Sequence, residues 1–218
     1  MDKKFINQQT KDNYNLIADH FSQKRSIDKA WFDWILPYVK NKQKIIDLGC
    51  GNGRLYGYLA QNFKNINYTG IDFSKKLIDI AKKTYPKAVF KNSDITESLT
   101  YEDFDNIDIV FSFRTIHHFP DNHQKFFNNC YKILKNNGFL ILEVWNMWQK
   151  RFWLDHLKQL SLKNLYIPYS AGKIKVNRFH YCFTKNELVK MAKKSGFKVL
   201  ESGIKNHGQN IYLVARKN

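Results

Sequence analysis

Three glycines after a short apolar run form the most informative segment of the chain. The run from Ile45 to Leu55 contains them on alternate positions, at Gly49, Gly51 and Gly53. Glycine lets a backbone approach a ligand closely and adopt φ values that other residues avoid. The residues that follow read as a helix, whose first N–H groups can bind an anionic group such as a carboxylate. The G-x-G-x-G spacing lacks the third glycine of the dinucleotide pattern, which argues against a nicotinamide cofactor.

Acidic residues stand at the ends of three successive predicted strands. Asp47 lies at the end of the first strand, Asp72 ends the second, and Asp94 follows the third, with Ile95 beside it. Each acid alone would more often be a solvated loop residue. Three in this order predict one ligand site at the carboxyl edge of a sheet, where carboxylates accept charge-assisted hydrogen bonds.

The elements that position these residues alternate between strands and helices. Strands are predicted over 44–48, 67–72, 88–91, 107–113 and 139–145, and the helices between them over 54–62, 73–85 and 121–134, the last closed by a turn at 135–138. Such alternation predicts a parallel sheet covered by helices on both faces. Helices are also expected over 13–22, 27–39 and 184–195, the last with a Thr184–Glu187 capping box, and antiparallel strands over 197–203 and 210–215. We therefore expect one α/β domain over residues 1–218, with N-terminal helices within 11–40.

Composition limits the class of protein and its partners. A hydrophobic content of 43% excludes a disordered chain, and no apolar run reaches the roughly 18–20 residues of a membrane span. Three scattered cysteines are too few for a disulfide framework, so we expect a cytoplasmic protein. The net charge of +17 suggests a polyanionic partner, nucleic acid before membrane, because no basic amphipathic helix dominates. A lysine-rich composition from an AT-rich genome would give the same surplus.

From about Tyr14 to Trp145 the chain resembles class I S-adenosylmethionine (SAM) methyltransferases. This resemblance implies a Rossmann-like, seven-stranded, mostly parallel sheet whose last strand is antiparallel. It also implies SAM as the cofactor, with Asp47 at its amino end, Asp72 at the ribose hydroxyls and Asp94 at the adenine amino group. The predicted cofactor-binding residues are Tyr14, Asp47, Gly49, Gly51, Gly53, Asp72, Asp94 and Ile95.

Shorter motifs resemble a narrower family, the methyltransferases of tRNA wobble uridine that esterify a 5-carboxymethyl group. The motifs are Tyr14–Arg25, Arg114–Phe119, Tyr166–Tyr169 and Arg178–Phe183. The resemblance implies a tRNA substrate and, from the eukaryotic members, a small activating protein partner. The chain departs from the pattern at Tyr169, where tryptophan is usual, and in the short segment between the last two motifs.

A carboxylate acceptor sets simple chemical demands. It is ionised at neutral pH, so it needs orientation rather than a general base, and the forked guanidinium of arginine can orient it. The candidate catalytic residues are Arg25, Arg114, Arg178, His117 and His180. Arg114 could instead pair with an acid structurally, and His117 and His118 could cap backbone groups. No third ligand with suitable spacing accompanies these two histidines, so we expect no metal.

Residues 146–180 form a basic, aromatic insertion that we expect to act as a substrate lid. It contains seven cations against the single acid Asp155, interleaved with Trp148, Trp153, Tyr166, Tyr169 and Phe179. Cations contact phosphates and aromatic rings stack on bases, although a solvated lid with an apolar underside fits the same pattern. Two other functions stay open: methylation of a small metabolite, and a non-catalytic tRNA- or protein-binding module that retains the fold.

Overall fold

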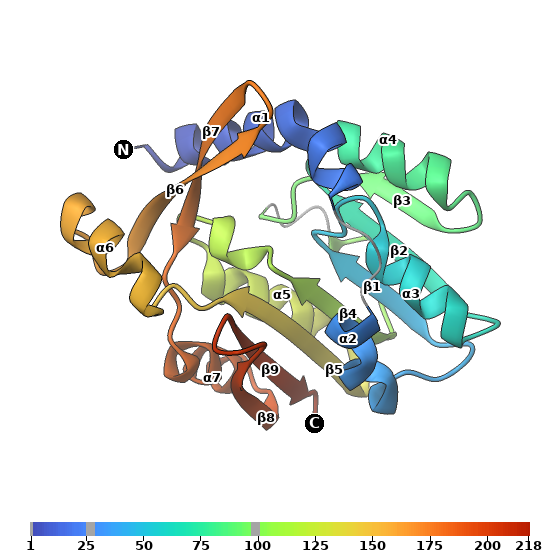
Figure 1. Ribbon diagram of the computed structural model, residues 1–218. Coiled ribbons are helices and arrows are strands. Elements are labelled where there is room, and N and C mark those ends of the chain that lie inside the picture. Colours follow the sequence, from blue (N-terminus) through green and yellow to red (C-terminus); the bar gives the residue numbers. More distant parts are fainter. Residues whose placement is uncertain (1, 25–28, 97–100) are drawn as a thin grey trace.

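The centre of the computed structural model, which describes residues 2–24, 29–96 and 101–218, is a seven-stranded sheet (Figure 1). Its order is β3-β2-β1-β4-β5-β9-β8. The strands are β1 (Lys44–Leu48), β2 (Asn67–Asp72), β3 (Val89–Asn92), β4 (Ile107–Phe113), β5 (Leu134–Trp145), β8 (Lys198–Lys205) and β9 (Asn210–Arg216). β9 runs antiparallel between β5 and β8, while the other pairings are parallel. The predicted sheet with an antiparallel last strand is confirmed.

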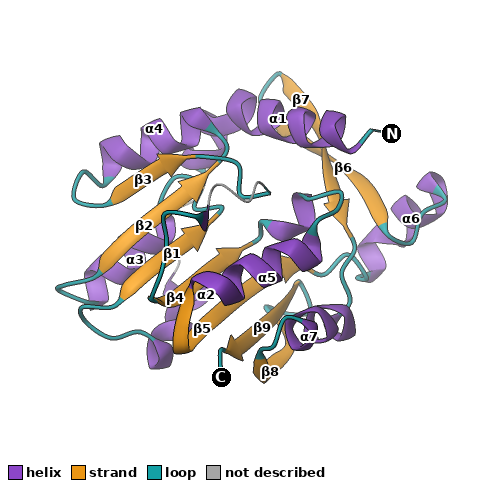
Figure 2. Cartoon of the chain, turned by 180° about the vertical axis from the view of Figure 1, so that it is seen from behind, coloured by secondary structure: helices purple, strands orange, loops and turns teal. Residues whose placement is uncertain are grey.

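Helices cover both faces of the sheet (Figure 2). α3 (Arg54–Asn62), α4 (Lys75–Thr84), α2 (Lys29–Phe32) and the 3-10 helix η1 (Asp33–Tyr38) pack on one face, and α5 (His123–Ile133) and α7 (Lys185–Lys194) on the other. Successive side chains of a strand point to opposite faces. Ile45 therefore packs in the core beneath α3 and α4, and Ile46 packs in the core beneath α5 and α7. Burial on both faces explains why these strands are continuous apolar runs.

The insertion is more regular than its sequence suggested. The 3-10 helix η4 (Lys150–Phe152) and α6 (Trp153–Gln159) lead into a separate hairpin, β6 (Asn164–Ala171) and β7 (Ile174–Tyr181). This hairpin packs against α1 (Lys3–Gln23) at residues such as Tyr14 and Val176, and against the 3-10 helix η3 (Ile116–His118). The hairpin and α1 are far apart in the sequence, but both lie at the end of the sheet where β1, β2 and β4 finish (Figure 1).

Several predicted boundaries were wrong for identifiable reasons. α1 begins at Lys3 because Asp2 accepts a hydrogen bond from the Lys4 N–H, and its first two turns are too polar for hydrophobic periodicity to reveal. The predicted helix over 27–39 is α2 followed by η1, with Pro37 inside the 3-10 segment, and residues 25–28 lie outside the described chain. The turn expected at 135–138 is an irregularity within β5, where Ile107 pairs with Leu134 but Ile109 pairs with Phe139. In the described part of the chain, none of the helices combines the length and apolar character that crossing a bilayer requires.

Candidate functional site

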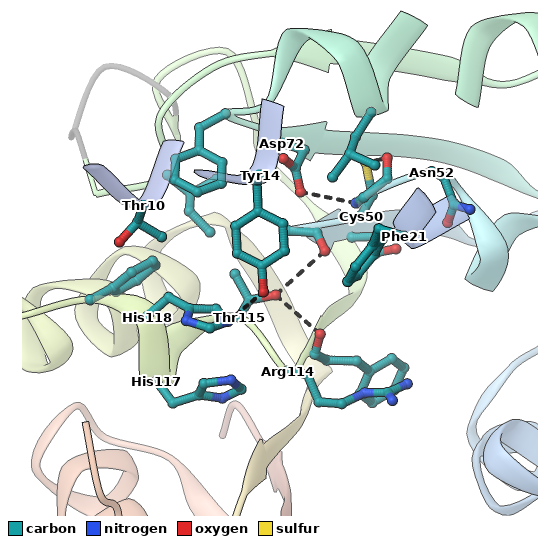
Figure 3. A pocket seen from close by; sticks show the side chains of 18 of the residues that line it. Thr10, Tyr14, Phe21, Cys50, Asn52, Asp72, Arg114, Thr115, His117 and His118 are labelled. Atoms are coloured by element: carbon teal, nitrogen blue, oxygen red, sulfur yellow. Dashed lines mark hydrogen bonds between the residues drawn. The ribbon is translucent and has the colours of Figure 1, made fainter. Parts of the chain in front are cut away.

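The glycine loop between β1 and α3 forms one wall of a pocket at the carboxyl edge of the sheet (Figure 3). Gly49, Gly51 and Gly53 have φ values of 84°, 54° and 80°, the left-handed region that glycine tolerates best. A Cβ on Gly49 would overlap the side chain of Thr115, whereas a Cβ on Gly51 would meet nothing within 4 Å. The loop is therefore closely packed beneath and open towards the pocket.

Asp72 connects the glycine loop to the start of α4. One carboxylate oxygen accepts a hydrogen bond from the Gly51 N–H and the other from the Ser74 N–H, both at 2.9 Å. Desolvation raises the pKa of Asp72 to about 6, and the two backbone N–H groups oppose that rise. A carboxylate accepts about four hydrogen bonds, so the side chain retains acceptor capacity for a ligand.

Asp47 lies deeper in the same wall. It is buried, accepts a 2.7 Å hydrogen bond from the Tyr68 hydroxyl, and lines the pocket. Burial raises its pKa to about 7, against the lowering effect of the Tyr68 hydrogen bond. A cationic group in the pocket would favour the ionised form.

Asp94, Ile95 and Tyr14 complete the predicted cofactor side of the pocket. Asp94 accepts hydrogen bonds at 2.8 Å from the N–H and the hydroxyl of Thr96, and Ile95 is buried beside it. Tyr14 reaches across from α1, and its hydroxyl lies 2.7 Å from Nε2 of His118. Figure 3 shows Tyr14 between Asp72 on one side and Arg114 and His118 on the other. All eight residues predicted to bind the cofactor are thus brought together, seven as pocket lining and Gly53 just behind it.

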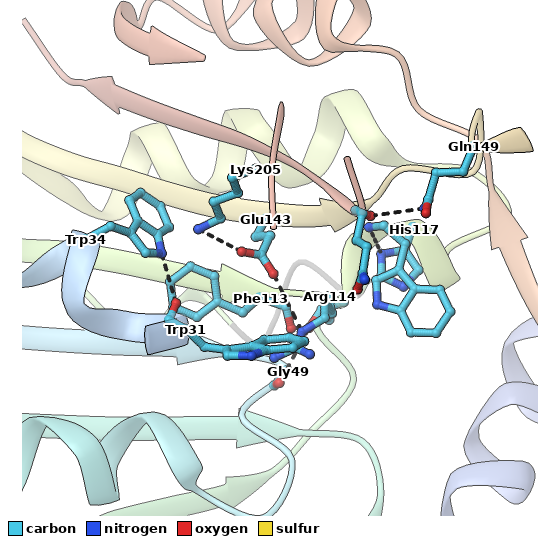
Figure 4. Close-up of polar contacts among 12 residues, drawn as sticks. Trp31, Trp34, Gly49, Phe113, Arg114, His117, Glu143, Gln149 and Lys205 are labelled. Carbon is cyan, nitrogen blue, oxygen red and sulfur yellow. Dashed lines mark hydrogen bonds and ion pairs between the residues drawn. The ribbon is translucent and has the colours of Figure 1, made fainter. Parts of the chain in front are cut away.

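Arg114 lines the pocket, but it pairs with an acid that it shares with Lys205. Its Nε lies 3.6 Å from Glu143 of β5, its guanidinium stacks on Trp31 at 4.0 Å, and Lys205 contacts the other Glu143 oxygen at 2.8 Å (Figure 4). Burial lowers the pKa of Lys205 to about 8, although Glu143 opposes this. The structural pairing left open from the sequence is therefore present.

Arg178 of β7 has different surroundings. It is 4% exposed, it lines the pocket, and its guanidinium carbon lies 4.7 Å from the ring centre of Tyr169 and 5.4 Å from that of Trp145. Its buried Nε has no hydrogen-bond partner. Over the described ranges, no acidic side chain forms an ion pair with it. The guanidinium therefore lies between aromatic rings, and none of the described acids compensates its charge.

Three histidines form a buried cluster next to Arg178. His180 brings a third imidazole to His117 and His118 from a segment sixty residues away, which sequence spacing does not reveal. Nδ1 of His118 lies 2.8 Å from the Phe179 carbonyl and Nδ1 of His180 lies 2.9 Å from the Arg178 carbonyl, so each Nδ1 is the donor. Burial, neighbouring imidazoles and Arg178 hold the pKa values of His117 and His180 well below the usual range, so both are neutral.

The cluster has the spacing of a metal site, since its ligand atoms lie within 4.8 Å of one another. Its surroundings favour a hydrogen-bonded group instead. Both ring nitrogens of His118 already have partners, and the Arg178 cation lies close enough to depress the pKa of His117 and His180. A divalent cation here would be repelled by that guanidinium, with no carboxylate ligand to offset it.

The remaining predictions have mixed outcomes. Arg25 lies outside the described residues. Within the insertion, Phe179 is 2% exposed and cannot stack on a base, whereas Trp153 is exposed.

Two further residues line the pocket but were not predicted from the sequence. Trp145, at the end of β5, lies beside Arg178. Thr10 lies one helical turn before Tyr14 on α1. A predicted helix that began earlier than residue 13 would have placed Thr10 on the same face as Tyr14.

Sequence comparisons identify related proteins. The family profile described as "Methyltransferase domain" matches residues 46–142. A demethylmenaquinone methyltransferase of Thermotoga maritima is 29% identical over 186 residues, 79% of each chain. A tRNA N(3)-methylcytidine methyltransferase of Schizosaccharomyces pombe is 25% identical over 75% of this chain and 54% of its own length. A trans-aconitate 2-methyltransferase of Escherichia coli is 28% identical over 59% and 49%, respectively.

Solved structures share the fold. A SAM-dependent methyltransferase of Methanosarcina mazei superposes with a TM-score of 0.71 at 20% identity, covering 84% of this chain and 96% of that one. A methyltransferase of Haloferax volcanii, solved in complex with the Trm112 methyltransferase activator, gives a TM-score of 0.71 at 14% identity over 95% and 96%.

Proposed function

Because this chain is a class I SAM-dependent methyltransferase, we propose that it transfers the methyl group of SAM to a carboxylate, and that this carboxylate is the 5-carboxymethyl group on the wobble uridine of a tRNA. When bound, SAM supplies an electrophilic methyl group on a sulfonium. The alternative of a non-catalytic module that retains the fold is set aside, since the chain is an enzyme.

The residues of the glycine-loop wall fit this cofactor. The Cβ-free face of Gly51 opens into the pocket, which allows a ligand to approach the backbone closely. Asp72 retains acceptor capacity for two ribose hydroxyls, and Asp47 is an acid whose ionised form a cationic amino group would favour. We assign these residues, with Tyr14, Gly49, Gly53, Asp94 and Ile95, to the cofactor.

The acceptor assignment depends mainly on Arg178, whose buried guanidinium forms no ion pair with any acid in the described part of the chain. Burying a charge without a partner is costly, and the cost is recovered when a ligand provides the opposite charge. Arg114 is less suited to this role, because it already has an acidic partner in Glu143. An anionic acceptor group between the aromatic rings of Tyr169 and Trp145 would complete the site.

The neutral histidines agree with a carboxylate acceptor. A carboxylate needs no general base, because it is already ionised at neutral pH. His117 and His180 have lowered pKa values, so they add no positive charge that would hold both carboxylate oxygens tightly. We propose that Arg178 orients one oxygen through charge-assisted hydrogen bonds while the other remains available for attack, with the histidines shaping the cavity.

Three observations support tRNA as the carrier of that carboxylate. The net charge is +17, the turn of the hairpin carries the exposed cation Lys173, and one relative is named as a tRNA methyltransferase. A tRNA acceptor would place the reaction in the cytoplasm. The Trm112-bound neighbour supports the further proposal of a small activating protein partner.

The test is methyl transfer to an anticodon stem-loop that carries 5-carboxymethyluridine, followed by mass spectrometry of its nucleosides. We expect a gain of one methyl group as an ester that mild base removes. Arg178→Ala should abolish transfer while leaving SAM binding by calorimetry within about twofold of wild type. Lys175→Ala, an exposed cation on the same hairpin, is the matched control and should retain activity.

A second candidate acceptor is a small carboxylic acid. It is favoured by the depth of Arg178, whose low exposure suits a compact ligand, and by the relative named for trans-aconitate. Labelled methyl recovered in the small-molecule fraction of an extract, with none in its tRNA, would select this candidate over tRNA.

A further inference from the structure

α6 and the turn after it carry a group of exposed apolar side chains, which we call the α6 patch. The side chains are Trp153 (59% exposed), Leu154 (65%), Leu157 (69%), Leu160 (93%) and Leu162 (67%). Scattered exposed apolar residues are ordinary, but five large ones within ten positions form a patch of the kind that binds another surface. Figures 1 and 2 both show α6 at the edge of the molecule, away from the central sheet.

The patch is held in place by its own framework. The buried ring of His156 has its two nitrogens 2.7 Å from the Ser161 carbonyl oxygen and 3.1 Å from the Met147 carbonyl oxygen, so the inner side of α6 is tied to the loops on both sides. Leu160 ends the helix with φ of 47°, a conformation that favours glycine or asparagine. An exposed leucine in this position has no packing role in the isolated chain.

The charges around the α6 patch are almost all positive. The exposed cations Lys150, Arg151 and Lys158 lie on η4 and α6, and the acid among them is the half-buried Asp155. Lys163 follows the patch and pairs with Glu187. Leucine and tryptophan side chains bordered by lysine and arginine are the composition of segments that lie in the interface of an anionic bilayer.

We propose that the α6 patch docks the enzyme on an anionic phospholipid surface. The apolar side chains would enter the boundary of the acyl region, and the cations would contact the phosphate groups. A second copy of the chain fits less well, because two such patches would bring like charges together. RNA fits less well because four of the five side chains of the patch are leucines, which offer no ring for base stacking. From the sequence, we expected nucleic acid before membrane because no basic amphipathic helix dominates. In the structure, the cations Lys150 and Arg151 of η4 and Lys158 of α6 border the apolar side chains of the patch.

This inference concerns attachment and does not depend on the acceptor. The patch and Arg178 nevertheless belong to one insertion. β6 follows α6 in the chain and pairs with β7, and in this pairing Ile167 lies opposite Arg178. Attachment through α6 would therefore hold the hairpin that carries Arg178 close to the bilayer.

The experiment is co-sedimentation of the full chain with vesicles of phosphatidylcholine alone or mixed with phosphatidylglycerol. We expect binding to the mixed vesicles, weakened at least about tenfold by the double change Leu154→Ser and Leu157→Ser, and reduced by high salt. Both leucines are exposed, so the folded state should be unaffected, which SAM binding by calorimetry checks. Leu16→Ser, an exposed leucine on α1, is the matched control and should bind like wild type.

Three outcomes would overturn the proposal. One is no sedimentation with phosphatidylglycerol vesicles at low salt. Another is binding that survives the double leucine change but is lost in Lys150→Glu with Lys158→Glu, since this would reflect charge alone. The third is a dimer, detected by light scattering, that the leucine changes dissociate while vesicles bind neither form, which would assign the patch to a second copy.

Discussion

The two walls of the pocket are built on opposite principles. The glycine-loop wall is acidic, and its carboxylates at Asp72 and Asp94 already accept hydrogen bonds from neighbouring backbone N–H groups. The wall formed by η3, the end of β5 and β7 is cationic and aromatic, and no acid within residues 2–24, 29–96 and 101–218 pairs with its Arg178. The acids of the first wall therefore have hydrogen-bond partners within the fold, whereas the guanidinium of the second wall has no ion-pair partner among the described residues.

This difference indicates where the function of the protein lowers its stability. Polar groups satisfied within the fold hold a binding surface in one geometry, while a buried unpaired charge lowers stability until a ligand arrives. We therefore expect changes in the glycine-loop wall to weaken both ligand binding and the fold. Changes at Arg178 should separate the two.

The largest effect is expected for Asp72→Ala. It removes acceptors for two ribose hydroxyls, each charge-assisted bond being worth about 1.5–3 kcal/mol, so SAM affinity should fall by about 10²–10⁴. It also leaves the Gly51 and Ser74 N–H groups without their partner, so the free energy of unfolding should fall as well. Calorimetry and urea unfolding measure the two effects. Asp79→Ala, at an exposed carboxylate paired with Lys75, is the control, and equal SAM affinity in both variants would remove Asp72 from the site.

The next effect is expected for Arg178→Met. Transfer to the carboxylate should fall by about 10²–10³ in kcat/KM, as expected for the loss of charge-assisted hydrogen bonds to one carboxylate oxygen, together worth roughly 3–4 kcal/mol. The free energy of unfolding should stay the same or rise, because a buried cation without a partner is replaced by an apolar side chain.

The contrasting variant is Arg114→Met. Here the removed cation is paired, so Glu143 would keep only Lys205 and the protein should lose about 2–4 kcal/mol of stability. If Arg178→Met destabilised the chain as much as Arg114→Met, Arg178 would be a structural residue and the contrast between the walls would fail.

The same contrast explains what the sequence could predict. The glycine-loop wall comes from residues 47–53, 72 and 94–95, each at a strand end, so local motifs and the order of strands were sufficient to predict it. The second wall joins η3, Trp145 and β7, and only folding brings His180 to His117. Glu143 lies inside an apolar strand, where nothing in its neighbours indicates that Arg114 will be its partner. Arg114 and Arg178 therefore looked equivalent in sequence and differ in the structure.

A third expectation concerns pH. The pKa of Asp47 is raised to about 7 and that of Asp72 to about 6, so between pH 4 and 7 the folded state holds protons that the unfolded state has released. Stability of the ligand-free protein should therefore fall as pH rises through this range, by at most about 1.4 kcal/mol per pH unit for each group. Urea unfolding of wild type and Asp47→Asn at pH 5 and 7.5 measures this. The variant should lose less stability on going to pH 7.5, and a parallel decline in both proteins would show that Asp47 is not the titrating group.

The smallest effect tests the contact that joins the two walls. The Tyr14 hydroxyl donates to Nε2 of His118, since Nδ1 of that ring already donates to the Phe179 carbonyl. Tyr14→Phe would leave a buried acceptor without its donor, so the free energy of unfolding should fall by about 1–2 kcal/mol. SAM affinity should change less than in Asp72→Ala, because the ring of Tyr14 still packs on Phe21 and Phe73. Tyr131→Phe, on a half-buried tyrosine of α5, is the control for removing a hydroxyl. A loss of SAM affinity as large as that of Asp72→Ala, without loss of stability, would mean that the Tyr14 hydroxyl serves the cofactor rather than the junction between the walls.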